Sequence, residues 1–219
     1  MNLKLAFYIL LIVAICSCTQ DQSANYAGIT EAVEIYTVTE DETGAGQGSL
    51  MYKESTKYKG KNMPIWRKFF DNEGKPKGEE RYLYTTGDLP TKSEYYDTND
   101  SLLSTYLLTN DKSLKRRSVA MQGAQEEILR IEEFDYDDKG NRITRTIKTA
   151  ASAVDKVYHF GFDDYGNETS VMVKDGAGKT LYTIDYTITK SDDHNRWTES
   201  WGFQNDKPMQ VKYRTFTAE

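Results

Sequence analysis

Residues 134–143, FDYDDKGNRI, contain the pattern that decides the fold: an alternating segment that runs into an Asp-rich turn with a glycine. Residues 160–167, FGFDDYGN, repeat this pattern 26 positions later. Asp, Asn and Gly supply the side-chain-bonded or left-handed backbone conformations that hairpin turns require. The two copies therefore predict two β-hairpins built on one plan.

The same plan extends over most of the chain beyond residue 28. Period-two alternation is interrupted by turn residues at intervals of about 10–15 positions, as in a β-meander. Tyr and Thr, which suit half-buried strands, are abundant, with 16 tyrosines in all. Further turn clusters lie at 71–74, 97–100, 138–141, 164–167, 175–178 and 204–207. We predict an all-β fold, an antiparallel meander of repeated hairpins that forms either a curled sheet or a barrel.

The turns also recur at a fixed spacing. An aromatic residue followed by Asp opens four of them, at 70–71, 96–97, 136–137 and 162–163. The first two and the last two are 26 positions apart, whereas the middle gap is 40. This spacing predicts a hairpin repeat that is degenerate or carries an insertion, for which residues 113–133 are the candidate. Part of this segment has a helical composition, but its alternation over 128–136 favours a strand.

The two Asp-rich copies resemble the YD repeat of the RHS family, in which aromatic-x-Tyr-Asp-x-x-Gly-Asn/Arg recurs along long β-sheet shells. The resemblance is good over residues 134–175 and fades to turn spacing elsewhere. It implies the sheet-building hairpin alone, because 219 residues leave no room for the toxin-enclosing shell of large RHS proteins.

The first twenty residues predict export and lipidation. Lys4 precedes an apolar run at 5–15, which suits the core of a signal peptide and falls short of the roughly 20 residues of a membrane-spanning helix. The tetrad ICSC at 15–18 resembles the lipobox of bacterial lipoproteins, which identifies Cys18 as the lipidated N-terminus; the alternative is an ordinary signal or an uncleaved anchor. Multiple acyl chains imply stable membrane attachment. The predicted organisation is a signal peptide (1–17), a lipidated cysteine and tether (18–28) and one β domain (29–219).

Net charge and composition limit the classes of molecule that the protein is expected to bind. The net charge of −6 argues against nucleic acid, and the basic triplet at 115–117 is interpreted as a solvated strand face. The strands are too charged on both faces for a membrane-embedded barrel. The QDQ segment at 20–22 lies where some Bacteroidetes lipoproteins carry an acidic export signal. We therefore expect an outer-membrane lipid anchor, with the cell surface slightly favoured over the periplasm.

Few residues suit catalysis or metal binding. His159 lies in an alternating segment and His194 in a turn, and no thiol pair, zinc motif or phosphate loop is present. The Asp-rich segments at 97–102 and 135–146 each lack a ligand or the glycine that a calcium loop needs. We expect no metal, no cofactor and no catalytic residue. A glycan-active enzyme with paired carboxylates is an alternative that no pair of residues supports.

The candidate binding residues are aromatic. Trp66, Trp197 and Trp201 fall on predicted strands, and the last two, four positions apart, are expected to share one face. Exposed, such a row could stack on sugar rings or seat a protein; the alternative is that the tryptophans form the core. Ser101, in the triplet DSL at 100–102, is similar to the O-glycosylation acceptor of exported Bacteroidetes proteins, although the triplet also serves as a turn.

Two function classes follow. The first is a non-enzymatic binding or scaffold module at the envelope, which binds surface glycans or proteins and exposes its tryptophans on one face. The second is a periplasmic inhibitor or immunity-type lipoprotein, which binds one protein partner and buries its tryptophans.

Overall fold

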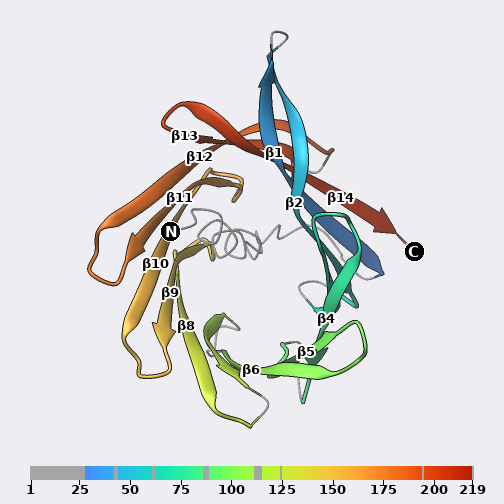
Figure 1. The fold of residues 1–219 in the computed structure, drawn as a ribbon, viewed down its shortest axis with the longest axis vertical. Helices are drawn as coiled ribbons and strands as arrows, with labels where there is room; N and C mark the ends of the chain where they lie inside the picture. The colour runs from blue at the N-terminus through green and yellow to red at the C-terminus, as the bar shows by residue number, and fades with distance from the viewer. Residues whose placement is uncertain are drawn as a thin grey trace.

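The chain folds into a closed β-barrel. The computed structural model describes residues 28–41, 44–60, 63–85, 89–110, 115–123, 125–193 and 195–218. Within them, β1 pairs with both β2 and β14, which closes the ring (Figure 1). The strands are β1 (Ile29–Asp41), β2 (Gly44–Tyr58), β3 (Pro64–Phe70), β4 (Pro76–Leu83), β5 (Lys92–Asp97), β6 (Leu102–Asn110), β7 (Arg116–Gln122), β8 (Ile128–Tyr136), β9 (Arg142–Thr149), β10 (Val154–Phe162), β11 (Glu168–Asp175), β12 (Thr180–Ser191), β13 (Trp197–Gln204) and β14 (Lys207–Ala218).

Every strand pairs antiparallel with the next strand in the chain, so the barrel is an up-and-down meander. The all-β prediction is confirmed, and of its two forms the barrel is the one observed. Among the described residues, no helix is long and apolar enough to cross a membrane.

Eight hairpin turns in the described part of the chain share one geometry. In each, the first amide donates to the fifth carbonyl and the fourth amide donates to the first carbonyl. The fourth residue has a positive φ, between 58° and 92°. This is the loop in which a type I turn is followed by a left-handed residue. The first positions are Asp71, Asp97, Gly123, Asp137, Thr149, Asp163, Asp175 and Asp192.

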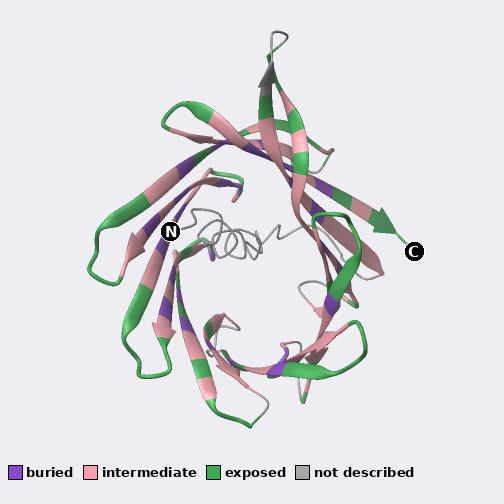
Figure 2. Cartoon of the chain, in the orientation of Figure 1, coloured by how far each residue is buried: buried purple, intermediate pink, exposed green. Residues whose placement is uncertain are grey.

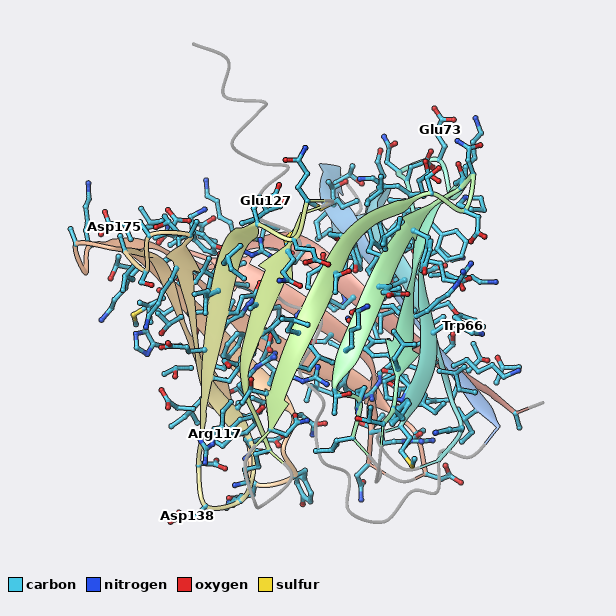
Figure 3. All side chains as sticks on the ribbon, turned by 90° about the horizontal axis from the view of Figure 1, so that it is seen from below. Trp66, Glu73, Arg117, Glu127, Asp138 and Asp175 are labelled. Atoms are coloured by element: carbon cyan, nitrogen blue, oxygen red, sulfur yellow. The ribbon has the colours of Figure 1, made fainter. Side chains whose placement is uncertain are left out.

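The turn series corrects the predicted insertion at 113–133. Turns that begin at 71, 97, 123, 149 and 175 connect odd strands to the following even strands, so they lie at one end of the barrel with an unbroken spacing of 26. The turns at 137 and 163 lie at the opposite end, as the positions of Glu73 and Asp138 show (Figure 3). The gap of 40 therefore joins two opposite ends. Residues 113–133 contain a regular hairpin between β7 and β8, and β8 confirms the strand predicted at 128–136.

The two clusters of buried apolar side chains lie on β6 to β12, and Val33, Ile35 and Val211 of β1 and β14 are buried as well. The larger cluster joins β9 to β12, and a smaller one joins β6, β7 and β8. Buried segments are purple in Figure 2. The larger cluster consists of Ile147, Tyr158, Phe160, Val171, Val173, Ile184 and Tyr186. Because these side chains come from alternate positions, they share one face of the sheet.

Candidate functional site: the inner wall of the barrel

One long-range contact identifies the inner face of the sheet. Lys212 of β14 places Nζ 3.3 Å from Glu168 Oε1 of β11, although β12 and β13 lie between these strands. Side chains that far apart around a curved sheet can meet only on its concave side. Lys212 pairs with Ile35 of β1, and Ile35 alternates with Val33, which pairs with Glu54 of β2. Following these pairings around the ring assigns the inner face of every strand.

The inner face of β7, β8 and β9 carries four arginines and one acid, which we call the arginine wall: Arg116, Arg130, Arg142, Arg145 and Glu132. Arg145 donates two hydrogen bonds to Glu132, at 2.7 and 2.8 Å, in a bidentate pair. Arg130 Nη2 lies 2.7 Å from Glu132 Oε1. The side chains of Arg145 and Glu132 are only 9% and 10% exposed. Burial alone would raise the pKa of Glu132, but the surrounding arginines outweigh it and hold this pKa below its usual value.

Two arginines of this wall, Arg116 and Arg142, form no ion pair with a carboxylate among the described residues. The Arg142 guanidinium lies 5.2 Å from the ring centroid of Phe134 and 5.3 Å from that of Phe160. Arg116 pairs with Asn110 of β6 across the ladder. The Nε atoms of Arg116, Arg130 and Arg142 are buried and have no hydrogen-bond acceptor among the described residues. The arginine wall therefore keeps both positive charge and unused donors.

The inner face of β1 to β4 is organised differently, and we call it the tyrosine wall. Its members are Glu31, Tyr52, Glu54, Tyr58, Arg67, Glu80 and Tyr82. Glu80 accepts hydrogen bonds from Tyr82 at 2.8 Å and from Ser93 at 2.6 Å. Arg67 lies between two acids, 3.7 Å from Glu54 and 4.0 Å from Glu80.

The edge of the tyrosine wall continues into β14. Glu31 accepts from Tyr58 at 2.9 Å and from Arg214 of β14 at 2.6 Å, and Tyr52 donates to Glu54 at 2.7 Å. In this wall the carboxylates accept hydrogen bonds from tyrosine hydroxyls and share arginines as ion-pair partners.

A third polar group lies beside the apolar core. Lys212 Nζ is 3.6 Å from the ring centroid of Tyr186, whose hydroxyl accepts from Gln210 at 2.9 Å. Burial raises the pKa of Tyr186. These contacts account for Lys212 as a paired structural cation. Among the described residues, no group of three or more His, Cys, Asp or Glu side chains is arranged to hold a metal ion.

The structure does not bring the three predicted tryptophans together. Trp66 lies on the outer face of β3, where Lys68 Nζ is 4.6 Å from its ring (Figure 3). Trp201 is also on the outer face and donates to Glu199 at 3.0 Å. All three tryptophans are half-buried.

Trp197 and Trp201 do not share one face, contrary to the sequence prediction. Two irregularities between β12 and β13 shift the register, so that Trp197 pairs with Ser191 whereas Glu199 pairs with Lys190. A bulge reverses the side-chain alternation. Trp197 accordingly lies 5.3 Å from the guanidinium of Arg214, which belongs to the inner face.

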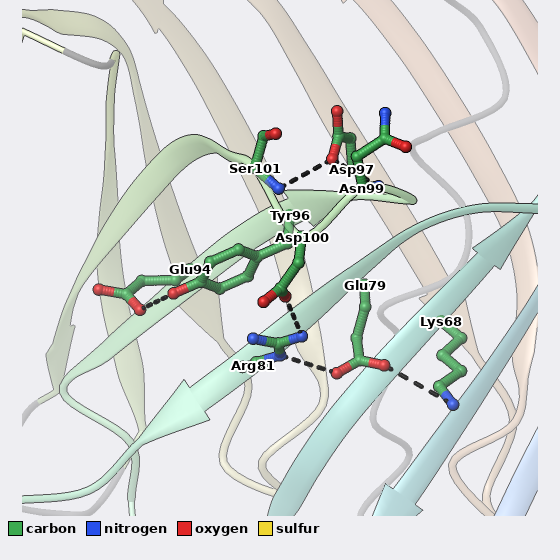
Figure 4. Close-up of polar contacts among 9 residues, drawn as sticks. All are labelled: Lys68, Glu79, Arg81, Glu94, Tyr96, Asp97, Asn99, Asp100 and Ser101. Carbon is green, nitrogen blue, oxygen red and sulfur yellow. Dashed lines mark hydrogen bonds and ion pairs between the residues drawn. The ribbon is translucent and has the colours of Figure 1, made fainter.

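Ser101 closes the turn between β5 and β6 and is exposed, with its amide bonded to Asp97 at 2.9 Å. Nearby on the outer surface, Arg81 links Glu79 and Asp100 and stacks on Tyr96 (Figure 4). His159 faces outward on β10, where it pairs with Met172. Cys18 and His194 lie outside the described residues.

Sequence reasoning missed the arginine wall. The basic triplet at 115–117 was predicted to be a solvated strand face, but this is wrong for Arg116, whose Nε is buried on the inner side. Arg117 is exposed and stacks on Tyr136 at 5.6 Å. The alternation of Arg130 and Glu132 on one strand was the available signal, but the contribution of β9 could not be seen without the pairing of β8 with β9.

Comparison with known proteins gives likeness in architecture only. No protein-family model and no curated protein sequence matches the chain. It is similar to a porin-like protein from Bacteroides uniformis, with 11% identity and a TM-score of 0.45 over 90% of this chain and 98% of that one. A porin-like protein from Bacteroides vulgatus has 9% identity and a TM-score of 0.39 over 83% and 97%. A LolA superfamily protein from Nitrosomonas europaea has 8% identity and a TM-score of 0.33 over 89% and 87%. Similarities this weak carry no conclusion about function.

Proposed function

We propose that this protein is a lipid-anchored module of the bacterial envelope that binds its ligand, without catalysis, on the inner wall of the barrel. The observation that carries the proposal is the polar lining of a ring of 14 strands. About 8 strands make a barrel that its own side chains fill, whereas about 16–18 leave a water-filled channel. A 14-stranded ring lies nearer the second case, and among the inner side chains Arg130, at 35% exposure, is one that a ligand can reach.

The anchor gives the barrel a direction. Cys18 is the proposed lipid attachment site, and β1 starts at Ile29, at the end of the barrel that also carries the turns at 137 and 163. This end would lie toward the membrane on a tether of about ten residues. The turns that begin at 71, 97, 123, 149 and 175 would point away from it.

Binding fits the inner acids better than hydrolysis does. A glycosidase needs one carboxylic acid that stays protonated to donate to the leaving group. Glu132 is bound by arginines that hold its pKa below its usual value, which does not suit a group that must keep a proton. This arrangement favours a carboxylate that orients other groups.

The ligand class proposed is a glycan or a protein segment with polar groups. The rival is a partner protein that docks on the outer face, where Trp66 and Trp201 lie. Attachment to the outer membrane, with display on the cell surface, is part of the same proposal, and protease digestion of intact and of permeabilised cells tests it.

Protection of an engineered cysteine from labelling would distinguish ligand binding on the inner face from binding on the outer face. Met121 faces inward and pairs with Arg130, whereas Ser118, on the same strand, faces outward and pairs with Glu133. Met121→Cys and Ser118→Cys in the full chain, purified in detergent, would be labelled with a maleimide in the presence of oligosaccharides or peptides. Slower labelling of the Met121→Cys chain alone supports the proposal. Slower labelling of Ser118→Cys alone favours the outer docking face, and protection of neither site by any ligand contradicts both.

A further inference from the structure

We propose that Arg116, Arg130 and Arg142 form an anion-binding site on the inner wall that recognises the carboxylate or sulfate groups of an acidic oligosaccharide. This inference rests on the proposed function, because it names the ligand class for the same inner surface. It begins from an imbalance of charge. The chain has a net charge of −6, yet the arginine wall sets four arginines against Glu132.

Glu132 cannot serve all four arginines. Arg145 occupies both of its oxygens, and Arg130 shares Oε1. The neighbouring strands supply no further acid to this surface. The inner face of β6 carries Ser104, Tyr106, Leu108 and Asn110, and that of β10 carries Tyr158, Phe160 and Phe162.

The acids nearest in sequence point elsewhere. Glu133 pairs with Lys148 at 2.6 Å, and Asp135 accepts from Thr144 at 2.7 Å, both on the outer face. Asp137 belongs to the turn between β8 and β9, where it accepts the amide of Asn141 at 2.7 Å. On β6 to β10, Glu132 is therefore the inward-facing carboxylate that pairs with the arginine wall.

The same arginines hold donors that lack acceptors. The buried Nε atoms of Arg116, Arg130 and Arg142 make no hydrogen bond within the described chain. A buried donor without an acceptor is costly, and a charged one more so, which favours an oxyanion that can accept from it. The Arg142 guanidinium also contacts the rings of Phe134 and Phe160, which restricts where its side chain can lie before any ligand arrives.

The neighbouring aromatic rings point to a saccharide as the carrier of the anion. Tyr106 is partly buried and packs against the cluster of Leu108, Val119 and Phe134. Rings at the edge of a charged site can stack on the apolar face of a sugar while arginine binds its acid group. Uronic acids and sulfated sugars combine both features, so they fit this surface better than neutral sugars.

Calorimetric titration tests the inference on the full chain in detergent. The probes are a galacturonic acid tetramer, a sulfated chondroitin tetramer and maltotetraose, which is neutral and of the same length. We expect the acidic probes to bind at least about tenfold more tightly than maltotetraose, and less tightly as salt is raised. Tighter binding of the chondroitin tetramer, which carries carboxylates and sulfates, would indicate that sulfate adds to recognition, whereas tighter binding of the galacturonic acid tetramer would indicate recognition of carboxylate. Equal binding of all three would overturn the inference and leave the proposed function standing, whereas binding of none would contradict both.

Arginine variants test the residues. Arg142→Gln should weaken binding of the acidic probe about tenfold, and Arg142→Lys less, because lysine keeps the charge but loses the planar fork. Arg130→Gln is the second variant, since its side chain is 35% exposed and tolerates change more readily. Arg81→Gln, the same substitution on the outer face, is the matched control and should bind as the parent does. Thermal unfolding verifies that each variant is folded, and unchanged binding by folded Arg142→Gln and Arg130→Gln would overturn the site.

Discussion

The arginine wall on β7 to β9 and the tyrosine wall on β1 to β4 are separated on one side of the ring by β5 and β6 alone, yet they balance their charges in different ways. In the tyrosine wall, Glu80 is served by the hydroxyls of Tyr82 and Ser93, with Arg67 at 4.0 Å. In the arginine wall, Glu132 is bound by charged guanidinium groups. The first wall satisfies its acids with neutral donors and a shared cation, whereas the second keeps cations in excess. The two walls therefore differ in charge balance, since several acids surround Arg67 in the first and several arginines surround Glu132 in the second.

Removal of the charge of Glu132 should have the largest effect on stability. Glu132→Gln would leave the buried Arg145 and its neighbours without a counter-charge, at a cost of about 3 kcal/mol in the free energy of unfolding. Glu80→Gln should cost about 1 kcal/mol, because the glutamine oxygen accepts from one of the two hydroxyls and its amide group can donate to the other. Urea unfolding of both variants measures the two costs. Equal costs would mean that the two walls do not differ as described.

Lowering the pH should weaken the contact between Glu132 and its arginines. The folded-state pKa of Glu132 lies below its unfolded value, so its contribution to stability is present above that unfolded value and is lost as pH falls through the folded pKa. The parent should therefore lose more stability than Glu132→Gln between pH 5 and pH 3, roughly the range in which such an acid titrates. Unfolding curves across this range provide the measurement. Parallel losses in the two proteins would assign the acid sensitivity to other groups.

A single hydroxyl donor in the tyrosine wall should contribute less to the free energy of unfolding than the charge of Glu132 does. Tyr82→Phe removes the 2.8 Å bond to Glu80 but leaves Ser93 as a donor to the same carboxylate. We expect a loss of about 1 kcal/mol in the free energy of unfolding, measured in urea. A loss as large as that of Glu132→Gln would show that Glu80 depends on one hydroxyl, and the tyrosine wall would not be a shared network.

Only part of the hairpin repeat could be predicted from sequence, because only some of its turns contain a recognisable Asp and Gly motif. Turns with Asp first and Gly fourth, such as 137–140 and 163–166, carry a visible signal. The turns that begin at Gly123 and Thr149 share the geometry but place Glu126 and Ser152 in the left-handed position. Because these two turns lack the Asp and Gly motif, the motif at 96–97 was compared with the one at 136–137, which lies at the opposite end of the barrel. The gap of 40 between them therefore suggested an insertion.

The candidate site was harder to predict for a different reason. The strand predicted from alternation over 128–136 places Arg130 and Glu132 two positions apart and so on one face, but Arg145 and Arg142 join them only through the pairing of β8 with β9. Bulges add a second difficulty, because each reverses the alternation. Trp197 and Arg116 both lie next to such irregularities, and both were assigned to the wrong surroundings from spacing alone. Local sequence patterns predict where the strands lie. They predict which side chains face the inside of the barrel only as far as the next bulge, because a bulge reverses the alternation.

The smallest effect is expected on the outer face, where ion pairs resemble those of the inner walls in geometry but not in burial. Arg81 donates to Glu79 at 2.9 Å and to Asp100 at 2.6 Å, and its guanidinium lies 4.2 Å from the Tyr96 ring (Figure 4). Its side chain is 45% exposed and that of Asp100 69%, so water replaces the lost contacts. Arg81→Gln should therefore leave the unfolding midpoint unchanged within error. A drop comparable to that of Tyr82→Phe would mean that burial does not set the strength of these pairs, and the contrast between the two inner walls would need another cause.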